Sequence, residues 1–398
     1  MCSPVEKITK GHLIKRKAIG KFPDNKRKID MKNYNYKARP IARSAAYRKK
    51  QMLKARLKLT VMAAVFVTVS VVGINGAKRL VRNMEAEAAS NDIIAAEDYQ
   101  AAEPAETAFE TIPEETSAPA GEKDVEYPID MQISSKYAVV YDVTTNTVLY
   151  AKNAEEKCYP ASTTKLLTAA LALDYADEDF VFTAGDELDF VNPGSSLAYL
   201  NKGSQLSTEM MIDALMLPSG NDAAYVTAAN IGRVIADNPN MSDEGAVKEF
   251  VNMMNRKAKR IGAQNTHFAN PDGFHDDNHY TTAMDMLKIA LYAKDCDMIA
   301  ESVQKVELTQ TFLSGEVIYW KNSNVMINPY SQFYYCYSKG MKTGMTDEAG
   351  YCVVELAERY DHQIIAVVMG GENAAARWND TIALLDKAFV IAKNYEAQ

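Results

Sequence analysis

Hydrophobic and polar residues follow several distinct patterns along the chain, and the first is a long apolar run. Residues 59–77 are nineteen consecutive positions without a charge, enough to cross about 30 Å of hydrocarbon as an α-helix. Lysine and arginine are denser just before this run than after it, so the positive-inside rule predicts a cytoplasmic N-terminus and an extracytoplasmic remainder. A buried core helix and a cleaved signal peptide are the alternatives, but the 58 residues ahead of the run favour an uncleaved transmembrane anchor.

Alternation typical of β-strands occurs at both ends of residues 127–398. Two runs near the start, residues 137–143 and 147–151, flank a short polar turn and predict a β-hairpin. Three more strand-like runs lie near the end, and the short polar turns between them favour antiparallel pairing. These three are residues 333–342, 351–356 and 363–370.

The segment between the two groups of strands has apolar residues at helical spacing. The predicted helices are residues 165–176, 208–217, 223–235, 244–261 and 282–293, with a further one at 375–393. Residues 127–398 are close to the upper limit for a single hydrophobic core. We therefore expect one layered α/β domain, with an antiparallel five-stranded sheet built from both ends and a mostly helical lobe inserted between them.

The formal charge of −8 is the sum of regions with opposite sign. Residues 1–58 hold 19 Lys and Arg against 3 acids, which predicts a disordered basic cytoplasmic tail attracted to anionic lipid. No recognisable motif in this tail supports nucleic-acid binding. Residues 85–126 hold 13 acids and a single lysine, so we interpret 78–126 as an acidic extracytoplasmic linker. A hydrophobic fraction of 47% excludes a wholly disordered chain, and five cysteines exclude a disulfide scaffold.

Residues 160–165, Pro-Ala-Ser-Thr-Thr-Lys, open the first long predicted helix and place two reactive side chains on one face. The hydroxyl of Ser162 needs a base to take its proton before it can attack a carbonyl. Lys165 can be that base if burial or nearby cations lower its pKa. The helix N-terminus also favours negative charge on a reacting oxygen. A capping serine followed by an exposed lysine would give the same pattern, so the motif alone is weak.

Two further motifs present polar groups at turns. Residues 217–222, Leu-Pro-Ser-Gly-Asn-Asp, predict a tight turn between helices, where catalytic groups are often found. A plain helix cap is the alternative. Residues 342–344, Lys-Thr-Gly, end a predicted strand. In that motif the lysine can bind a carboxylate, the threonine can donate a hydrogen bond, and the glycine allows a substrate to approach the backbone.

The three motifs, in the order S-x-x-K, S-x-N, K-T-G, resemble the signature of penicillin-binding proteins and serine β-lactamases. From about residue 135 to 393 the chain is similar to the low-molecular-mass D-alanyl-D-alanine carboxypeptidases, serine peptidases that trim the stem peptide of bacterial peptidoglycan. The resemblance implies the penicillin-binding protein fold. Longer stretches also resemble the family: residues 151–154, 160–165, 217–224, 266–273, 279–285 and 340–346, with 349–350.

The resemblance implies a catalytic role for four residues. Ser162 would attack the carbonyl between the two terminal D-alanines and become the acyl-enzyme, with Lys165 as general base. Ser219 would pass a proton toward the leaving amine, and Asn221 would hold both the lysine and the substrate amide. Neither a metal nor another cofactor is implied.

The resemblance also implies how a substrate is held. Lys342 and Thr343 would bind the terminal carboxylate, beside the open backbone of Gly344. The backbone N–H groups of Ser162 and Met345 would form the oxyanion hole. The implied partners are the peptidoglycan stem peptide as substrate and β-lactams as covalent inhibitors. Nothing in the sequence indicates an oligomeric state.

Two departures from the family pattern concern residues near the site. Met345 stands where the family often has an aromatic residue or histidine, and residues 272–274, Asp-Gly-Phe, stand where it often has His-Gly-Leu. We expect these to change rate or substrate fit. Many relatives also continue into a β-rich second domain and a C-terminal anchor, which the N-terminal span would replace.

Other functions are compatible with the same motifs. Endopeptidase or transpeptidase action on cross-linked muropeptides uses the same chemistry. A β-lactamase is less favoured, because no E-x-x-x-N element lies between Ser219 and Lys342. An inactive wall-binding membrane protein would keep the fold but need not keep every reactive side chain.

Two histidines and four cysteines are discounted as sites. His275 and His279 flank carboxylates but lack the H-E-x-x-H pattern of a zinc site, and we expect a loop there. Cys158, Cys296, Cys336 and Cys352 follow the apolar run, where disulfides are possible. We expect small buried thiols, since Cys336 is out of register with Cys352, which should face roughly position 342.

Overall fold

The computed structural model of the protein describes residues 127–177 and 179–396. The predicted basic tail, the apolar run at 59–77 and the acidic linker all lie outside these residues. Within the described ranges, none of the helices combines the length and the apolar character that a membrane span requires.

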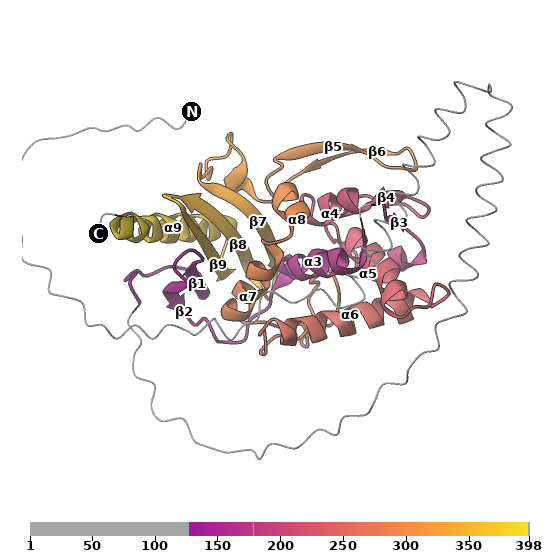
Figure 1. The fold of residues 1–398 in the computed structure, drawn as a ribbon, viewed down its shortest axis with the longest axis horizontal. Helices are drawn as coiled ribbons and strands as arrows, with labels where there is room; N and C mark the ends of the chain where they lie inside the picture. Colours follow the sequence, from indigo (N-terminus) through magenta and orange to yellow (C-terminus); the bar gives the residue numbers. More distant parts are fainter. Residues whose placement is uncertain (1–126, 178, 397–398) are drawn as a thin grey trace, which may run out of the picture. The chain divides into compact units, whose positions relative to one another are not determined.

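Strands from both ends of the described chain form one antiparallel sheet (Figure 1). Its five strands follow the order β2-β1-β9-β8-β7, which confirms the predicted architecture. The early hairpin pairs directly with the last strand, so that Tyr137 lies opposite Met369. The strands are β1 (Tyr137–Asp142), β2 (Thr147–Lys152), β7 (Ser338–Thr346), β8 (Gly350–Arg359) and β9 (His362–Gly371).

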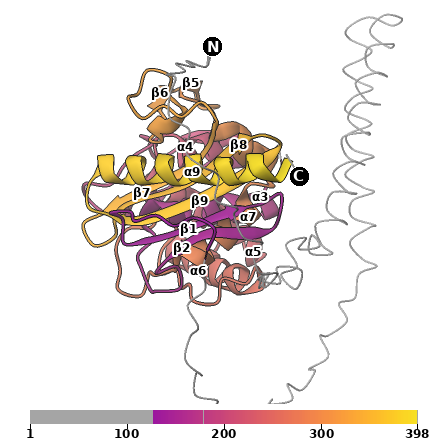
Figure 2. The ribbon, with the colours of Figure 1, turned by 90° about the vertical axis from the view of Figure 1, so that its left-hand side faces the viewer.

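Helices cover both faces of this sheet. On one face lies a helical lobe, and on the other lies the single long helix α9 (Ala374–Glu396) (Figure 2). Successive strand residues point to opposite faces of the sheet: Val139 and Val367 pack with the lobe, whereas Val140 and Ala366 pack with α9. The lobe contains α3 (Lys165–Tyr175), α4 (Thr208–Met216), α5 (Asn221–Ile235), α6 (Asp243–Arg260), α7 (Ala283–Ala293) and α8 (Asp297–Ser302).

The strand predicted at 333–342 was misplaced, and the observed strand is β7. Its alternating aromatic residues gave a strand-like pattern, but Tyr335 and Tyr337 lie in the irregular connection before β7 and pack toward α9. The rings of Tyr337 and Phe389 are 6.0 Å apart between centroids. As a result the Lys-Thr-Gly motif lies inside a strand that continues to Thr346, and does not end it.

The sequence also missed several short elements. A hairpin is formed by β5 (Glu307–Thr311) and β6 (Val317–Lys321). Of its strand residues only Trp320 is fully buried, and Val317 and Tyr319 are exposed. Short strands have too few residues for a clear period. The remaining elements are β3 (Val181–Thr183), β4 (Gln205–Ser207) and the 3-10 helices η2 (Ala161–Thr164), η3 (Asp186–Phe190) and η4 (Val325–Ile327).

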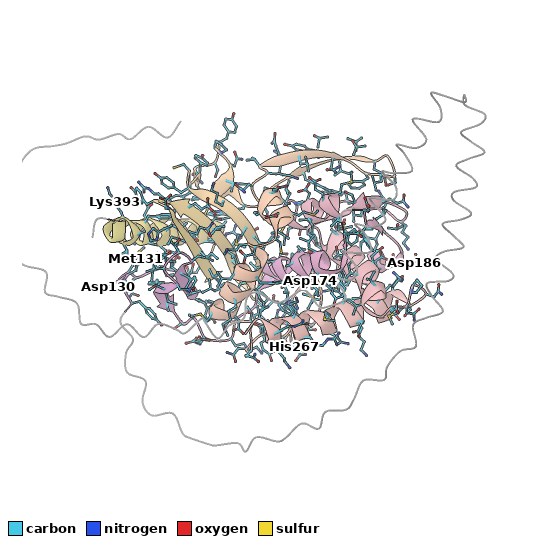
Figure 3. All side chains as sticks on the ribbon, viewed as in Figure 1. Asp130, Met131, Asp174, Asp186, His267 and Lys393 are labelled. Carbon is cyan, nitrogen blue, oxygen red and sulfur yellow. The ribbon has the colours of Figure 1, made fainter. Side chains whose placement is uncertain are left out.

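Side chains fill the space between the sheet and the helices on either side of it (Figure 3). The core on the lobe side joins α3, α4, α5 and α7 to the sheet, and the smaller core lies under α9. Both walls of the candidate active site are therefore fixed by packed elements: α3 and α5 on one side, and β7 on the other.

Candidate active site

The segment before α3 presents Ser162 from a tight and strained turn. Ala161 has a φ of +48°, a value that non-glycine residues seldom adopt. The hydroxyl of Thr163 donates to Pro160 O over 2.6 Å. Gly273 lies directly against this turn, because a Cβ placed there would be 1.9 Å from Ala161 O. Ser162 is only half-buried while its neighbours in η2 are buried, so it is the residue of this short helix that solvent reaches.

Lys165 lies fully buried beneath Ser162 and makes three hydrogen bonds. Its Nζ donates to Ser162 Oγ over 2.9 Å, to Asn221 Oδ1 over 2.7 Å and to the backbone oxygen of Asp272 over 2.7 Å. Burial lowers the pKa of Lys165 to about 8, and the carboxylates of Asp272 and Asp222 oppose that shift. A lysine whose pKa lies near neutrality can serve as a general base.

The S-x-N turn supplies a second hydroxyl. Ser219 has a φ of +62°, and its Oγ is buried without a hydrogen-bond partner among the described residues. A buried hydroxyl without a hydrogen-bond partner destabilises the folded state unless a bound group forms a hydrogen bond with it. Gly220 is tightly packed, since a Cβ there would lie 2.7 Å from the Cβ of Ala198.

The loop before β4 holds the S-x-N turn in place. Ser196 Oγ donates to Ser219 O over 2.8 Å, and Asn221 N donates to Ser196 O over 2.8 Å. Asn221 Nδ2 also donates to Ser195 Oγ over 2.9 Å. The two serines therefore fix both the backbone of the turn and the amide plane of Asn221, which leaves its Oδ1 toward Lys165.

Strand β7 forms the opposite wall. Among the described strands it lies at the edge of the sheet, where it pairs with β8. Lys342 is fully buried, and its Nζ donates to Thr343 O over 3.1 Å. Burial lowers the pKa of Lys342 well below its usual value, and the nearby positive charges of Lys165 and Arg377 lower it further. The motif thus holds a desolvated amine for which an incoming anion would be the missing counter-charge.

Gly344 brings the two walls into contact. A Cβ at this position would lie 2.9 Å from Ser162 N and 3.0 Å from Pro160 O, so only glycine fits without displacing Ser162. The next residue, Met345, has a 54% exposed side chain and lies opposite Tyr351 in the ladder. The geometry thus brings all eight sequence-predicted site residues to the two facing walls of one site.

Several supporting residues were missed by sequence reasoning. Arg377 on α9 donates to Gly344 O over 3.3 Å and to Cys352 O over 3.0 Å, and burial lowers its pKa to about 10. Its guanidinium carbon lies 4.0 Å from the ring centroid of Trp378. No local pattern marks an arginine in a distant helix, so only the fold could have found it.

Asp272, noted from the sequence as a departure, acts on Lys165 mainly through its backbone oxygen. That bond does not depend on the side chain, so another residue type at this position could make it too. The carboxyl group is buried, and burial raises its pKa while Lys165 opposes the rise. One carboxyl oxygen accepts from Phe274 N over 3.2 Å.

His279 contacts the short helix η2 that contains Ser162. Its Nε2 lies 2.8 Å from Thr164 Oγ1, and burial lowers the pKa of His279 to about 3. The loop predicted around the two histidines is present.

Cys352 is buried and lies opposite Gly344, two residues from the expected position 342, whereas Cys336 is exposed in the turn before β7.

Comparison with known proteins gives consistent matches. The family model described as D-alanyl-D-alanine carboxypeptidase matches residues 122–373. The chain is 33% identical over 265 residues to the D-alanyl-D-alanine carboxypeptidase DacF of Bacillus subtilis, covering 64% of this chain and 62% of the relative. It is 30% identical to the D-alanyl-D-alanine carboxypeptidase of Streptomyces sp. strain K15, covering 62% of this chain and 84% of the relative.

A solved structure agrees with these sequence matches. The crystal structure of the Streptomyces K15 DD-transpeptidase superposes with a TM-score of 0.60 at 30% identity, and the match covers 67% of this chain and all of that one. The chain spans about three-fifths of the length of the Bacillus relative.

Proposed function

The chain belongs to the D-alanyl-D-alanine carboxypeptidase family, and on that premise we propose that it removes the terminal D-alanine of peptidoglycan stem pentapeptides through an acyl-enzyme on Ser162. The hydrogen bond of 2.9 Å from Lys165 Nζ to Ser162 Oγ carries the proposal. The pKa of that lysine, about 8, leaves part of it neutral at physiological pH. A neutral amine at this distance can take the serine proton.

The free C-terminus of the substrate binds against β7. Its carboxylate approaches Lys342, where a negative charge favours the protonated amine that burial otherwise disfavours. Thr343 donates its hydroxyl hydrogen bond to the same carboxylate. This requirement for a free terminal carboxylate suits an exopeptidase.

Acylation and deacylation follow from the positions of the side chains. Ser162 Oγ attacks the carbonyl carbon between the two D-alanines while its proton passes to Lys165 Nζ. The N–H groups of Ser162 and Met345 stabilise the resulting oxyanion. The C–N bond then breaks, and the leaving amine receives a proton through the hydroxyl of Ser219. A water molecule attacks the ester, and the shortened peptide leaves as Ser162 regains its proton.

The test is D-alanine release from a stem pentapeptide, together with covalent labelling by a fluorescent penicillin. Ser162→Ala should abolish both. Ser331→Ala is a matched control. It also removes a serine hydroxyl, but one outside the three motifs, which accepts from Phe333 N in the connection before β7. Labelling of Ser162→Ala at the wild-type level would refute the assignment of the nucleophile.

Transpeptidation is a second candidate, since the Streptomyces K15 structural neighbour is described as a DD-transpeptidase. In that reaction an amine of another stem peptide, and not water, attacks the acyl-enzyme. Assaying free D-alanine beside dimer formation and dimer cleavage separates carboxypeptidase, transpeptidase and endopeptidase action.

We propose further that residues 59–77 anchor the protein in the cell membrane, with the N-terminus cytoplasmic and residues 127–398 outside. The uninterrupted apolar run and its basic flank support this. Protease added to intact protoplasts should then remove the catalytic domain and leave a protected N-terminal fragment. Release of the domain into the medium without protease would indicate signal cleavage.

A further inference from the structure

Ser323 lies between the two walls of the site, in the connection from β6 to β7. Its Oγ is 2.8 Å from Thr343 Oγ1 in the Lys-Thr-Gly motif. Its backbone N–H donates to Leu217 O over 3.0 Å, at the start of the S-x-N turn. One residue therefore joins the carboxylate-binding strand to the turn that carries Ser219.

The neighbours of Ser323 fix its backbone on both sides. Asn322 Nδ2 donates to Val303 O over 3.2 Å and to Lys305 O over 3.0 Å. Asn324 is buried, and its Nδ2 donates to Glu355 Oε2 over 2.7 Å. With the main chain held in this way, the torsion of the Ser323 hydroxyl remains adjustable.

A count of protons shows what this hydroxyl does. Thr343 Oγ1 carries one proton and can accept two hydrogen bonds, and the same holds for Ser323 Oγ. A carboxylate only accepts, so Thr343 must give its proton to a bound C-terminus. The contact of 2.8 Å to Ser323 can then persist only if Ser323 is the donor.

We propose that Ser323 is a positioning residue, whose hydroxyl donates to Thr343 when a carboxylate is bound and so turns the threonine proton toward it. The resulting chain runs from Ser323 to Thr343 to the carboxylate. Successive hydrogen bonds of this kind polarise and strengthen one another. The inference rests on the proposed function, because it assumes that a carboxylate binds at β7.

The experiment compares two penicillins that differ only in this carboxylate: benzylpenicillin and its methyl ester. The second-order rate constant of acylation is measured for each. Ser323→Ala should slow acylation by the free acid about threefold to tenfold, the worth of one net hydrogen bond, while acylation by the ester changes by less than about twofold. Ser323→Thr should retain the wild-type ratio, and so should Ser331→Ala.

A double-mutant cycle isolates the link between the two hydroxyls. In a Thr343→Val background no hydroxyl remains for Ser323 to orient, so Ser323→Ala should cause no further loss with the free acid. Ser323→Cys fills nearly the same volume with a much weaker donor. It should lower the acid-to-ester ratio even if Ser323→Ala folds poorly.

Equal losses with acid and ester would overturn the proposal and leave Ser323 a purely structural residue. An undiminished effect of Ser323→Ala in the Thr343→Val background would overturn it as well. A wild-type protein that reacts with neither penicillin would instead overturn the proposed function, and this inference with it.

Discussion

Under the proposed mechanism, acylation of Ser162 should depend steeply on pH, because that mechanism needs the neutral form of Lys165. Burial disfavours the ammonium form and lowers the pKa of Lys165 to about 8. The reactive fraction therefore rises with pH and levels off above that value.

The expected magnitude follows from this pKa. About half of the lysine is neutral at pH 8, about 9% at pH 7 and about 1% at pH 6, since each pH unit changes the ratio of the two forms tenfold. The carboxylates of Asp272 and Asp222 raise the pKa of Lys165 against the effect of burial. The charge of Lys165 in turn lowers the pKa values of Lys342 and His279. The rate constant for acylation should thus fall nearly tenfold per unit on the acid side.

The assay is the second-order rate of labelling by a fluorescent penicillin, measured between pH 6 and 9.5. Circular dichroism at each pH checks that the fold persists over the range. A rate that is constant from pH 6 to 9 would refute the assignment of Lys165 as the base that must lose its proton. A labelling rate that falls as pH rises through 8 would be opposite to the expected dependence and would also refute that assignment.

Three further substitutions test the geometry of the site. Asp272→Asn removes a negative charge that favours protonated lysine, so the midpoint of the labelling curve should move to lower pH, and an unchanged midpoint would contradict this. Gly344→Ala places a Cβ 2.9 Å from Ser162 N, so labelling should slow about a hundredfold with little change in the midpoint of thermal unfolding. Gly273→Ala puts a Cβ 1.9 Å from Ala161 O at a φ of +85°, so the free energy of unfolding should drop by about 2–4 kcal/mol in a urea titration. Wild-type stability of that variant would show that the turn can move aside.

The motif residues could be predicted from the sequence because each motif is local. Ser162 and Lys165 share one helical turn, and their spacing alone predicts that they meet. The sequence did not contain the distance from Gly344 to Ser162, which depends on how β7 packs against η2. The resemblance to a family implied that the Lys-Thr-Gly motif lies close to Ser162. The fold explains this closeness, because β7 packs against η2.

The supporting residues could not be predicted, because their roles depend on tertiary contacts. Ser195, Ser323 and Arg377 belong to a loop, a connection and a distant helix, and none follows a recognisable pattern. The aromatic run before β7 shows the opposite failure. Alternation normally indicates a strand, but here Tyr335 and Tyr337 pack under α9 from an irregular connection.

Pairing of β1 with β9 links the order of folding to the order of synthesis. The β1–β2 hairpin is made early, yet its partner strand β9 emerges only after the whole helical lobe. Contacts between such distant segments form slowly. Ser162 and Lys165 are likewise made long before Lys342 and Thr343, which arrive with β7. An unfinished chain therefore contains the serine but not the wall that holds a carboxylate, so the nucleophile should gain its reactivity toward peptides and penicillins only once the sheet has closed.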